Sequence, residues 1–411
     1  MKSILNRKIS LSWLGIIVSV VGLLVAFLAW VLPQRARLRT EEEKRLKQIE
    51  KMVDLANKNI ENIERNFGLP IYAEGLSSAS SVVLGTFVEG TQLMGEYKWD
   101  NAIKEFRKAT NDAKGSELVT LFNLIGFCNY RLGKLDLASL NYNISQLLAQ
   151  HYGDRKGAAI ALGNIGLIYR IKGDLDMALK YCEESRKVSH EISYIKCEAA
   201  QLGNIGLIYE TKGSLDKALE YYINALKKGR EIKSREEEAR QLGNIGNVCL
   251  ARCDLEQAMK YHQEALKLDR ELKNKEGEVI DIGNLGLVYK KQGNFDKAME
   301  YFKEALRLSK EIGYKEGEVN QLTNIGIIYQ SKGDLNQSLK YYQNALKLDK
   351  EIGNKEGEAI DLNNIGSLFQ DKGNFNKALN HFNQALTIFK QIGAQKEIKI
   401  IEDNIRVLKN N

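Results

Sequence analysis

The stretch LGNIGLIYRIKGDLDMALKYC, residues 162–182, recurs with few changes as LGNIGLIYETKGSLDKALEYY at 202–222 and IGNLGLVYKKQGNFDKAMEYF at 282–302. One glycine of this stretch can be followed further, first after 36 residues and then every 40: Gly90, Gly126, Gly166, Gly206, Gly246, Gly286, Gly326 and Gly366. Self-similarity at a fixed period is the signature of a repeat architecture. The sequence therefore predicts a stack of similar units.

Each unit has the pattern of two helices. Leu162, Ile165 and Tyr169 fall three and four residues apart, which places them on one helical face. Gly173 supplies a turn, and Ala178 opens the apolar face of a second helix. Neither helix can bury its apolar face alone, so we expect stacked units to form an all-α superhelix.

The recurring glycine lies inside the first helix of each unit, as Gly166 does. Glycine in a helix interior costs roughly 0.8–1 kcal/mol relative to alanine. Because an unfavourable residue recurs in every unit, we expect two helices to approach each other closely at this position.

These features resemble the tetratricopeptide repeat: a first helix with L-x-x-I-G-x-x-Y, a glycine turn, and a second helix with A-x-x-x-Y/F-x-x-A. The turn glycine is Gly133, Gly173, Gly213, Gly293, Gly333 and Gly373, and the aromatic residue is Phe106, Tyr142, Tyr222, Phe302, Tyr342 and Phe382. Tyr97 and Cys253 replace the turn glycine in two units, and Cys182 and His262 replace the aromatic residue in two. The resemblance implies a right-handed α-solenoid of about eight helix-turn-helix units over residues 82–393, closed by a capping helix at 394–411.

Two features depart from the usual repeat. The period is 40 rather than about 34 residues, and no proline follows the second helix. This longer unit is similar to the repeats of kinesin light chains and of Pins-type polarity proteins, which present an inner groove to extended peptides.

The composition excludes several classes of protein. Only 2 prolines and 5 cysteines occur in 411 residues, which disfavours Pro-rich disorder and a disulfide-built fold. The net charge of +7 comes from 60 basic and 53 acidic residues, a mixed surface rather than one for nucleic acid. We find no phosphate-binding loop, zinc motif or nucleophile elbow, and we expect no catalytic residues, no metal and no cofactor. Cys249 and Cys253 occupy repeat positions, as does His262, so we interpret them as packing or turn residues.

An uncharged run extends from Ile9 to Gln34. Its apolar part, residues 11–32, would be roughly 33 Å long as a helix, enough to cross a bilayer core of about 30 Å. The alternative is a cleavable signal peptide, whose apolar region would be shorter. Basic residues are more frequent after the run than before it, which favours a single-pass membrane protein with a cytoplasmic repeat domain.

A helical stalk is predicted at residues 36–67, before a linker at 68–81. Its apolar residues are spaced three and four apart, at Leu46, Ile49, Val53, Ala56, Ile60, Ile63 and Phe67. This seam, residues 46–67, fits either a short coiled coil that joins chains into a homo-oligomer or one amphipathic helix lying on the repeat domain or the membrane.

One polar position recurs without an evident packing need: Asn164, Asn204, Asn244, Asn284, Asn324, Asn364 and Asn404. The family resemblance implies that this position faces the concave groove. A carboxamide can donate to and accept from a peptide backbone, so the row could bind an extended ligand. The alternative is that each asparagine bonds a neighbouring helix and fixes the stacking.

Varied positions on the same wall would set specificity. One residue after the helix glycine lie Leu167, Leu207, Asn247, Leu287, Ile327 and Ser367, and six before it lie Ile160, Ala200, Arg240, Ile280, Asn320 and Ile360. Arg240 is the one charge in its row. It could meet a ligand carboxylate or simply be solvated at a helix start.

The sequence thus predicts a membrane-anchored adaptor that captures an extended peptide of a partner protein. The alternative is a structural assembly factor that docks folded partners and oligomerises through its stalk.

Overall fold

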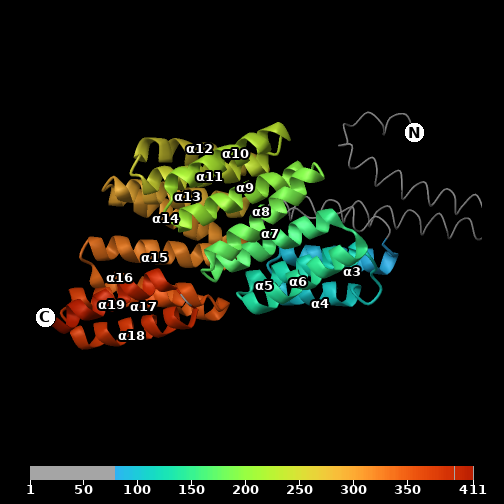
Figure 1. The fold of residues 1–411 in the computed structure, drawn as a ribbon. Helices are drawn as coiled ribbons and strands as arrows, with labels where there is room; N and C mark the ends of the chain where they lie inside the picture. Colours follow the sequence, from blue (N-terminus) through green and yellow to red (C-terminus); the bar gives the residue numbers. More distant parts are fainter. Residues whose placement is uncertain (1–78, 393, 411) are drawn as a thin grey trace, which may run out of the picture.

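A computed structural model describes residues 79–392 and 394–410, which contain 17 helices and no strand. The helices, numbered as in Figure 1, are α3 (Ser81–Gly95), α4 (Trp99–Ala109), α5 (Ser116–Arg131), α6 (Leu135–Tyr152), α7 (Arg155–Ile171), α8 (Leu175–Glu191), α9 (Ile195–Thr211), α10 (Leu215–Glu231), α11 (Arg235–Ala251), α12 (Leu255–Leu272), α13 (Lys275–Lys291), α14 (Phe295–Ile312), α15 (Lys315–Ser331), α16 (Leu335–Ile352), α17 (Lys355–Asp371), α18 (Phe375–Ile392) and α19 (Gln395–Asn410).

The helices form a solenoid of consecutive pairs. Each odd-numbered helix from α3 to α17 packs most extensively on the helix that follows it, and each pair then packs on the next (Figure 1). The last helix, α19, covers α18, where Ile398, Ile401 and Ile405 join the core. The predicted all-α solenoid is therefore confirmed.

The recurring glycine brings the two helices of a unit together, as expected. A Cβ on Gly206 of α9 would lie 2.5 Å from the ring of Tyr222 on α10, closer than atoms can approach. The same contact joins the other helix glycines to Phe106, Tyr142, Phe302, Tyr342 and Phe382, and to Cys182 and His262 where the aromatic residue is replaced. Both replacements are fully buried, so their interpretation as packing residues is confirmed.

The turns between paired helices have a left-handed residue at a fixed position. Gly213 adopts φ 75°, a conformation that side chains disfavour. Tyr97 and Cys253 adopt φ 58° and 61° at the equivalent positions without being glycine. Cys253 is exposed at its turn, as its interpretation as a turn residue requires.

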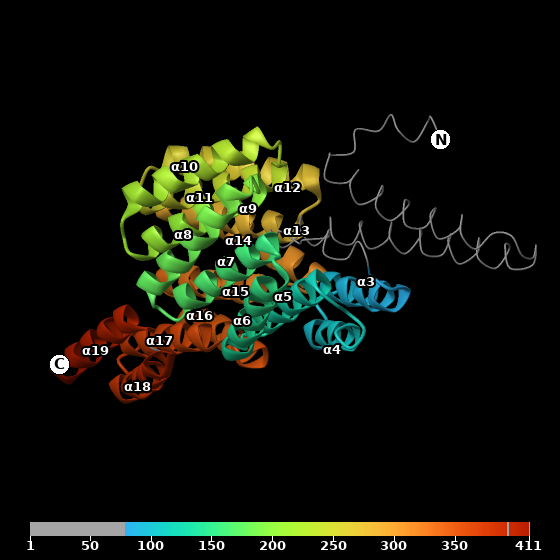
Figure 2. The ribbon, with the colours of Figure 1, turned by 45° about the vertical axis from the view of Figure 1, so that its right-hand side comes forward.

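The solenoid curves until its second pair meets the sixth and seventh pairs. Figures 1 and 2 show α5 and α6 beside the ends of α15–α17. Arg131, at the end of α5, binds Glu276 of α13 at 3.1 Å and Glu316 of α15 at 3.9 Å. The Arg131 guanidinium also lies 4.8 Å above the Trp99 ring, and its side chain is only 11% exposed. We call this cluster the closing contact.

The predicted membrane span (11–32) and stalk (36–67), and the linker up to residue 78, lie outside the described residues. Among α3 to α19, no helix combines the length and apolar composition needed to cross a bilayer. Helix α3 begins at Ser81, and the side chain of Ser80 caps it by accepting a hydrogen bond from the Val83 backbone N–H.

Candidate ligand-binding cavity

The solenoid curves around an open central cavity of about 2260 Å³. Its wall comes from the first helices α9, α11 and α13, and its rim from loops near Gly133, Gly173, Gly353 and Ala394. A smaller hollow of about 450 Å³ lies over α13, α15 and α17. Neither space is sealed, so a chain segment can enter from solvent.

Several predicted site residues lie in these spaces. The central cavity is lined by Leu207, Arg240, Asn244, Asn247 and Asn284, and the smaller hollow by Asn284, Leu287 and Asn324. Asn164, Asn204, Asn364 and Asn404 line neither space. The structure thus gathers the middle of the predicted row at one site and leaves its ends outside.

Four asparagines of the row make hydrogen bonds within the protein. Asn164 donates to Asn123 of the preceding unit at 3.5 Å, and Asn404 donates to Asn363 at 3.2 Å. Asn204 and Asn244 donate to Gln201 and Gln241 of their own helices, at 3.1 and 3.2 Å. The side-chain amides of these four residues therefore already have hydrogen-bond partners within the solenoid.

Asn284, Asn324 and Asn364 differ from the other asparagines. Their side chains are half-buried and make no hydrogen bond to any other residue that the structure describes. Since Asn284 and Asn324 also line the cavities, their carboxamides are available to a ligand.

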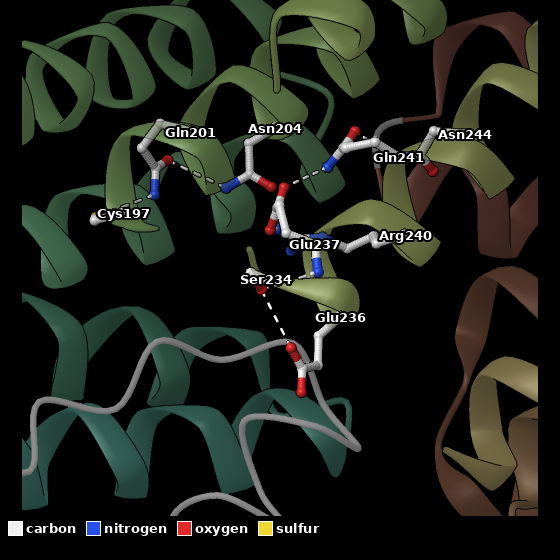
Figure 3. A network of polar contacts seen from close by, with 9 residues as sticks. All are labelled: Cys197, Gln201, Asn204, Ser234, Glu236, Glu237, Arg240, Gln241 and Asn244. Carbon is white, nitrogen blue, oxygen red and sulfur yellow. Dashed lines mark hydrogen bonds and ion pairs between the residues drawn. The ribbon is translucent and has the colours of Figure 1, made fainter. Parts of the chain in front are cut away.

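Arg240 is already paired. Its guanidinium binds the carboxylate of Glu237 one turn earlier in α11, and Gln241 donates to the other oxygen of Glu237 at 2.7 Å (Figure 3). Ser234 caps the same helix by accepting from the Glu237 backbone. A ligand carboxylate would have to compete with Glu237 for Arg240.

Beneath the asparagines runs a second polar row that is buried. Gln201, Gln241 and Gln321 each insert a carboxamide against a glycine of the preceding unit. A Cβ on Gly163 would lie 2.3 Å from the Gln201 amide nitrogen, so the Gln201 side chain packs directly on the glycine backbone. The row is thus part of the interface between units.

Two units replace glutamine by aspartate and pair it with a second aspartate. These pairs are Asp269 with Asp281 and Asp349 with Asp361, and all four side chains are buried. Burial raises the pKa of Asp361 to about 8 and that of Asp349 to about 6. Each pair therefore holds a proton near neutral pH.

The first aspartate pair also faces a histidine. His262 Nδ1 lies 3.5 Å from Asp281, and burial lowers the pKa of His262 to about 4. Burial also raises the pKa of Asp269 to about 7 and that of Asp281 well above its usual range. Near neutral pH His262 is therefore uncharged, and the two aspartates carry at most one negative charge between them.

Sequence reasoning did not identify the aspartate pairs or the closing contact. The pairs carried a signal, because Asp269 and Asp281 recur 80 residues later as Asp349 and Asp361, while Ser309 and Gln321 occupy the unit between them. The closing contact carried no such signal, since Arg131 and Glu276 are 145 residues apart and belong to no common motif.

Comparisons with known proteins agree with this fold. Two family models described as tetratricopeptide repeat match the chain, one at residues 197–271, 242–311 and 318–391 and the other at 159–185. A search of curated proteins gives no significant match. The comparisons do not support the expected similarity to kinesin light chains or Pins-type proteins.

Three solved structures share the arrangement at low sequence identity. A Rap protein complexed with Competence and Sporulation Factor is 14% identical with a TM-score of 0.54, over 80% of this chain and 97% of that one. The Rap conjugation gene regulator of plasmid pLS20, in complex with the Phr* peptide, is 18% identical with a TM-score of 0.56, over 66% and 76%. The apo form of RapI is 16% identical with a TM-score of 0.52, over 66% and 99%. At these identities the similarity concerns the fold alone.

Proposed function

The chain carries tetratricopeptide repeats, and on this premise we propose that it is an adaptor whose central cavity and adjoining smaller hollow capture an extended segment of a partner protein. The observation that carries the proposal is the pair of half-buried carboxamides, Asn284 and Asn324, that line the cavities without a partner among the described residues. A peptide backbone offers a donor and an acceptor at every residue, which matches a carboxamide.

Apolar side chains flank these carboxamides. Ile280 is 47% exposed and Ile360 40% exposed, although both lie on the inner wall. Leu287 lies beside them in the smaller hollow. Polar groups for the backbone between apolar side chains suit a partly hydrophobic segment in extended conformation.

Two of the structures with the same fold are complexes with a ligand. They contain Competence and Sporulation Factor in one case and the Phr* peptide in the other. These neighbours support a peptide-sized occupant for the cavity of this chain, which we propose has no catalytic role.

We further propose that residues 11–32 anchor the adaptor in a membrane, with the repeats on the cytoplasmic side. The support is the uncharged run and the basic residues after it. Protease added to intact cells should leave the repeats whole, and a reporter fused after Asn411 should read cytoplasmic. Digestion of the repeats from outside would reverse the orientation.

A second candidate is an assembly factor that oligomerises through residues 46–67, favoured by the apolar seam there. Light scattering of the full chain in detergent micelles, beside the variant Ile49→Lys/Ile60→Lys, tests it. A multimer that becomes monomeric in the variant would favour this candidate, and a monomer in both would exclude it.

The adaptor proposal is tested by selecting peptides from a displayed random library on the full chain. The selected peptides should lose binding when Asn284 and Asn324 are replaced by alanine. Peptides that bind both proteins equally would show that the cavity is not the binding site.

A further inference from the structure

The second helix of the second unit, α6, has an unusual exposed face, which begins at the rim of the central cavity. Leu137 is 43% exposed, Leu140 is 55% exposed and Leu147 is 64% exposed. With the half-buried Ile144 they form one stripe spaced three, four and three residues apart. We call these four residues the α6 stripe.

No other second helix among α4 to α18 carries such a stripe. The position of Leu140 is held by Lys180, Glu220, Lys260, Glu300, Lys340 and Asn380, and that of Leu147 by Lys187, Lys227, Lys267, Arg307, Lys347 and Thr387. Because these units pack in the same way, packing between units does not require leucine here. Adjacent exposed apolar residues on a helix mark a surface that something else covers.

The chain itself contains a matching partner. The apolar seam of residues 46–67 repeats at the same intervals of three and four as the α6 stripe. A helix with such a seam is stable in water only when the seam is covered. The seam and the α6 stripe are therefore two apolar surfaces of the same chain, and each could cover the other.

The connection between them is long enough. Residues 68–80 separate the seam from α3, and thirteen residues can span up to about 45 Å. The α3–α4 pair packs on α5, and α5 packs on α6, with neighbouring helices about 10 Å apart. A short tether also gives the seam a millimolar effective concentration at α6, which favours it over a second copy of the chain.

We propose that the α6 stripe is the docking site of residues 46–67 of the same chain. Leu137 lies at the rim of the central cavity, whereas Leu140, Ile144 and Leu147 line neither the central cavity nor the smaller hollow. The docking would hold the repeats in a fixed position against the segment that leads to the predicted membrane span.

Cysteine cross-linking of the full chain in detergent micelles tests the docking. The background carries Cys249→Tyr and Cys253→Gly, which restore the residues of the other units and leave the three buried cysteines in place. Val53→Cys is then combined with Leu140→Cys, or with Glu220→Cys at the equivalent position of α10 as a control. A short bismaleimide should join the first pair within one chain roughly tenfold or more faster than the second, because docking raises the local concentration.

Equal rates for the two pairs would overturn the proposal. So would cross-links that form between chains when the Val53→Cys and Leu140→Cys proteins are mixed, since the occupant would then be a second copy.

Limited proteolysis provides a second measurement in which the repeats should remain folded. Leu140→Lys/Leu147→Lys gives α6 the outer residues that α16 carries at Lys340 and Lys347. Trypsin should cut the variant at Lys51 and Lys58 roughly tenfold or more faster than the parent, because losing even one buried leucine shifts docking by about that factor. The control Lys180→Ala/Lys187→Ala on α8 should leave the rate unchanged. Unchanged cleavage in the α6 variant would show that the segment does not lie on the stripe.

Discussion

Asp349 and Asp361 place a proton inside the interface between α16 and α17. Asn354 donates to Asp349 at 2.8 Å and Thr323 donates to Asp361 at 2.8 Å, so each carboxyl already has one polar partner. The remaining oxygens have no other partner among the described residues, and the pair itself holds the proton between them. A second negative charge in this buried place would be strongly unfavourable.

The pair makes stability depend on pH. The usual pKa of aspartate is 3.8, and here it is raised to about 6 for Asp349 and about 8 for Asp361. Between the usual pKa of 3.8 and the raised pKa of each group, the folded chain keeps a proton that the unfolded chain has lost. Folding therefore becomes less favourable as pH rises through this range. The melting temperature should therefore fall between pH 5 and pH 8, by calorimetry of the full chain.

The neighbouring unit supplies a matched variant for this measurement. Asp349→Ser/Asp361→Gln introduces the residues found at Ser309 and Gln321. It should make the pH dependence less steep, with the remainder due to Asp269 and Asp281. Asp349 with Asp361 is a cleaner test than Asp269 with Asp281, because Tyr342 replaces the nearby His262. A melting profile as steep in the variant as in the parent would show that the protons are held elsewhere.

At the scale of the helix pair, the close approach of α9 and α10 explains the helix glycine. Alanine at Gly206 would gain roughly 0.8–1 kcal/mol of helix propensity but collide with the Tyr222 ring. Overpacking of a core costs typically about 1–3 kcal/mol, so we expect Gly206→Ala to lower the melting temperature. Gly85→Ala in α3 is the control, since no atom apart from the adjacent backbone of α3 lies within 4 Å of the new Cβ, and it should raise the melting temperature. If both changes raise it, the close approach does not explain the glycine.

The elements were predictable because their information is local. The apolar spacing around Leu162 and Ile165, the turn at Gly173 and the 40-residue period specify helices and their pairing without reference to the rest of the chain. The direction of each asparagine was not predictable to the same degree. Asn204 and Asn284 occupy the same repeat position, yet the first bonds Gln201 and the second has Asp281 at the corresponding place.

Curvature at the scale of the whole molecule could not be read from the sequence. It accumulates from small rotations between successive units, and it decides that Arg131 reaches Glu276 and Glu316. It also decides that the middle of the asparagine row lines the cavities while Asn164 and Asn404 lie outside them.

The closing contact should hold the solenoid in its curved form. Removing one partner of a buried ion pair costs roughly 3–5 kcal/mol, because the other charge stays buried and unpaired. Arg131→Ala leaves Glu276 in that state, so we expect small-angle scattering to show a larger radius of gyration. Lys134→Ala, which breaks an exposed pair with Asp100, should leave the radius unchanged. An unchanged radius for Arg131→Ala would mean that packing between units alone sets the curvature.

The central claim is that the central cavity and the smaller hollow bind an extended segment through Asn284 and Asn324, and titration calorimetry tests it most directly. A peptide selected on the full chain is titrated into the parent, into Asn284→Ala/Asn324→Ala, and into Asn164→Ala/Asn404→Ala as the control. Each lost hydrogen bond to the ligand costs about 0.5–1.5 kcal/mol, so the first variant should lose roughly 1–3 kcal/mol, or about 5- to 150-fold in affinity. Its melting temperature should not fall, since these side chains have no partner among the described residues. The control should keep its affinity. Full affinity in Asn284→Ala/Asn324→Ala, with a loss in Asn164→Ala/Asn404→Ala, would contradict the account.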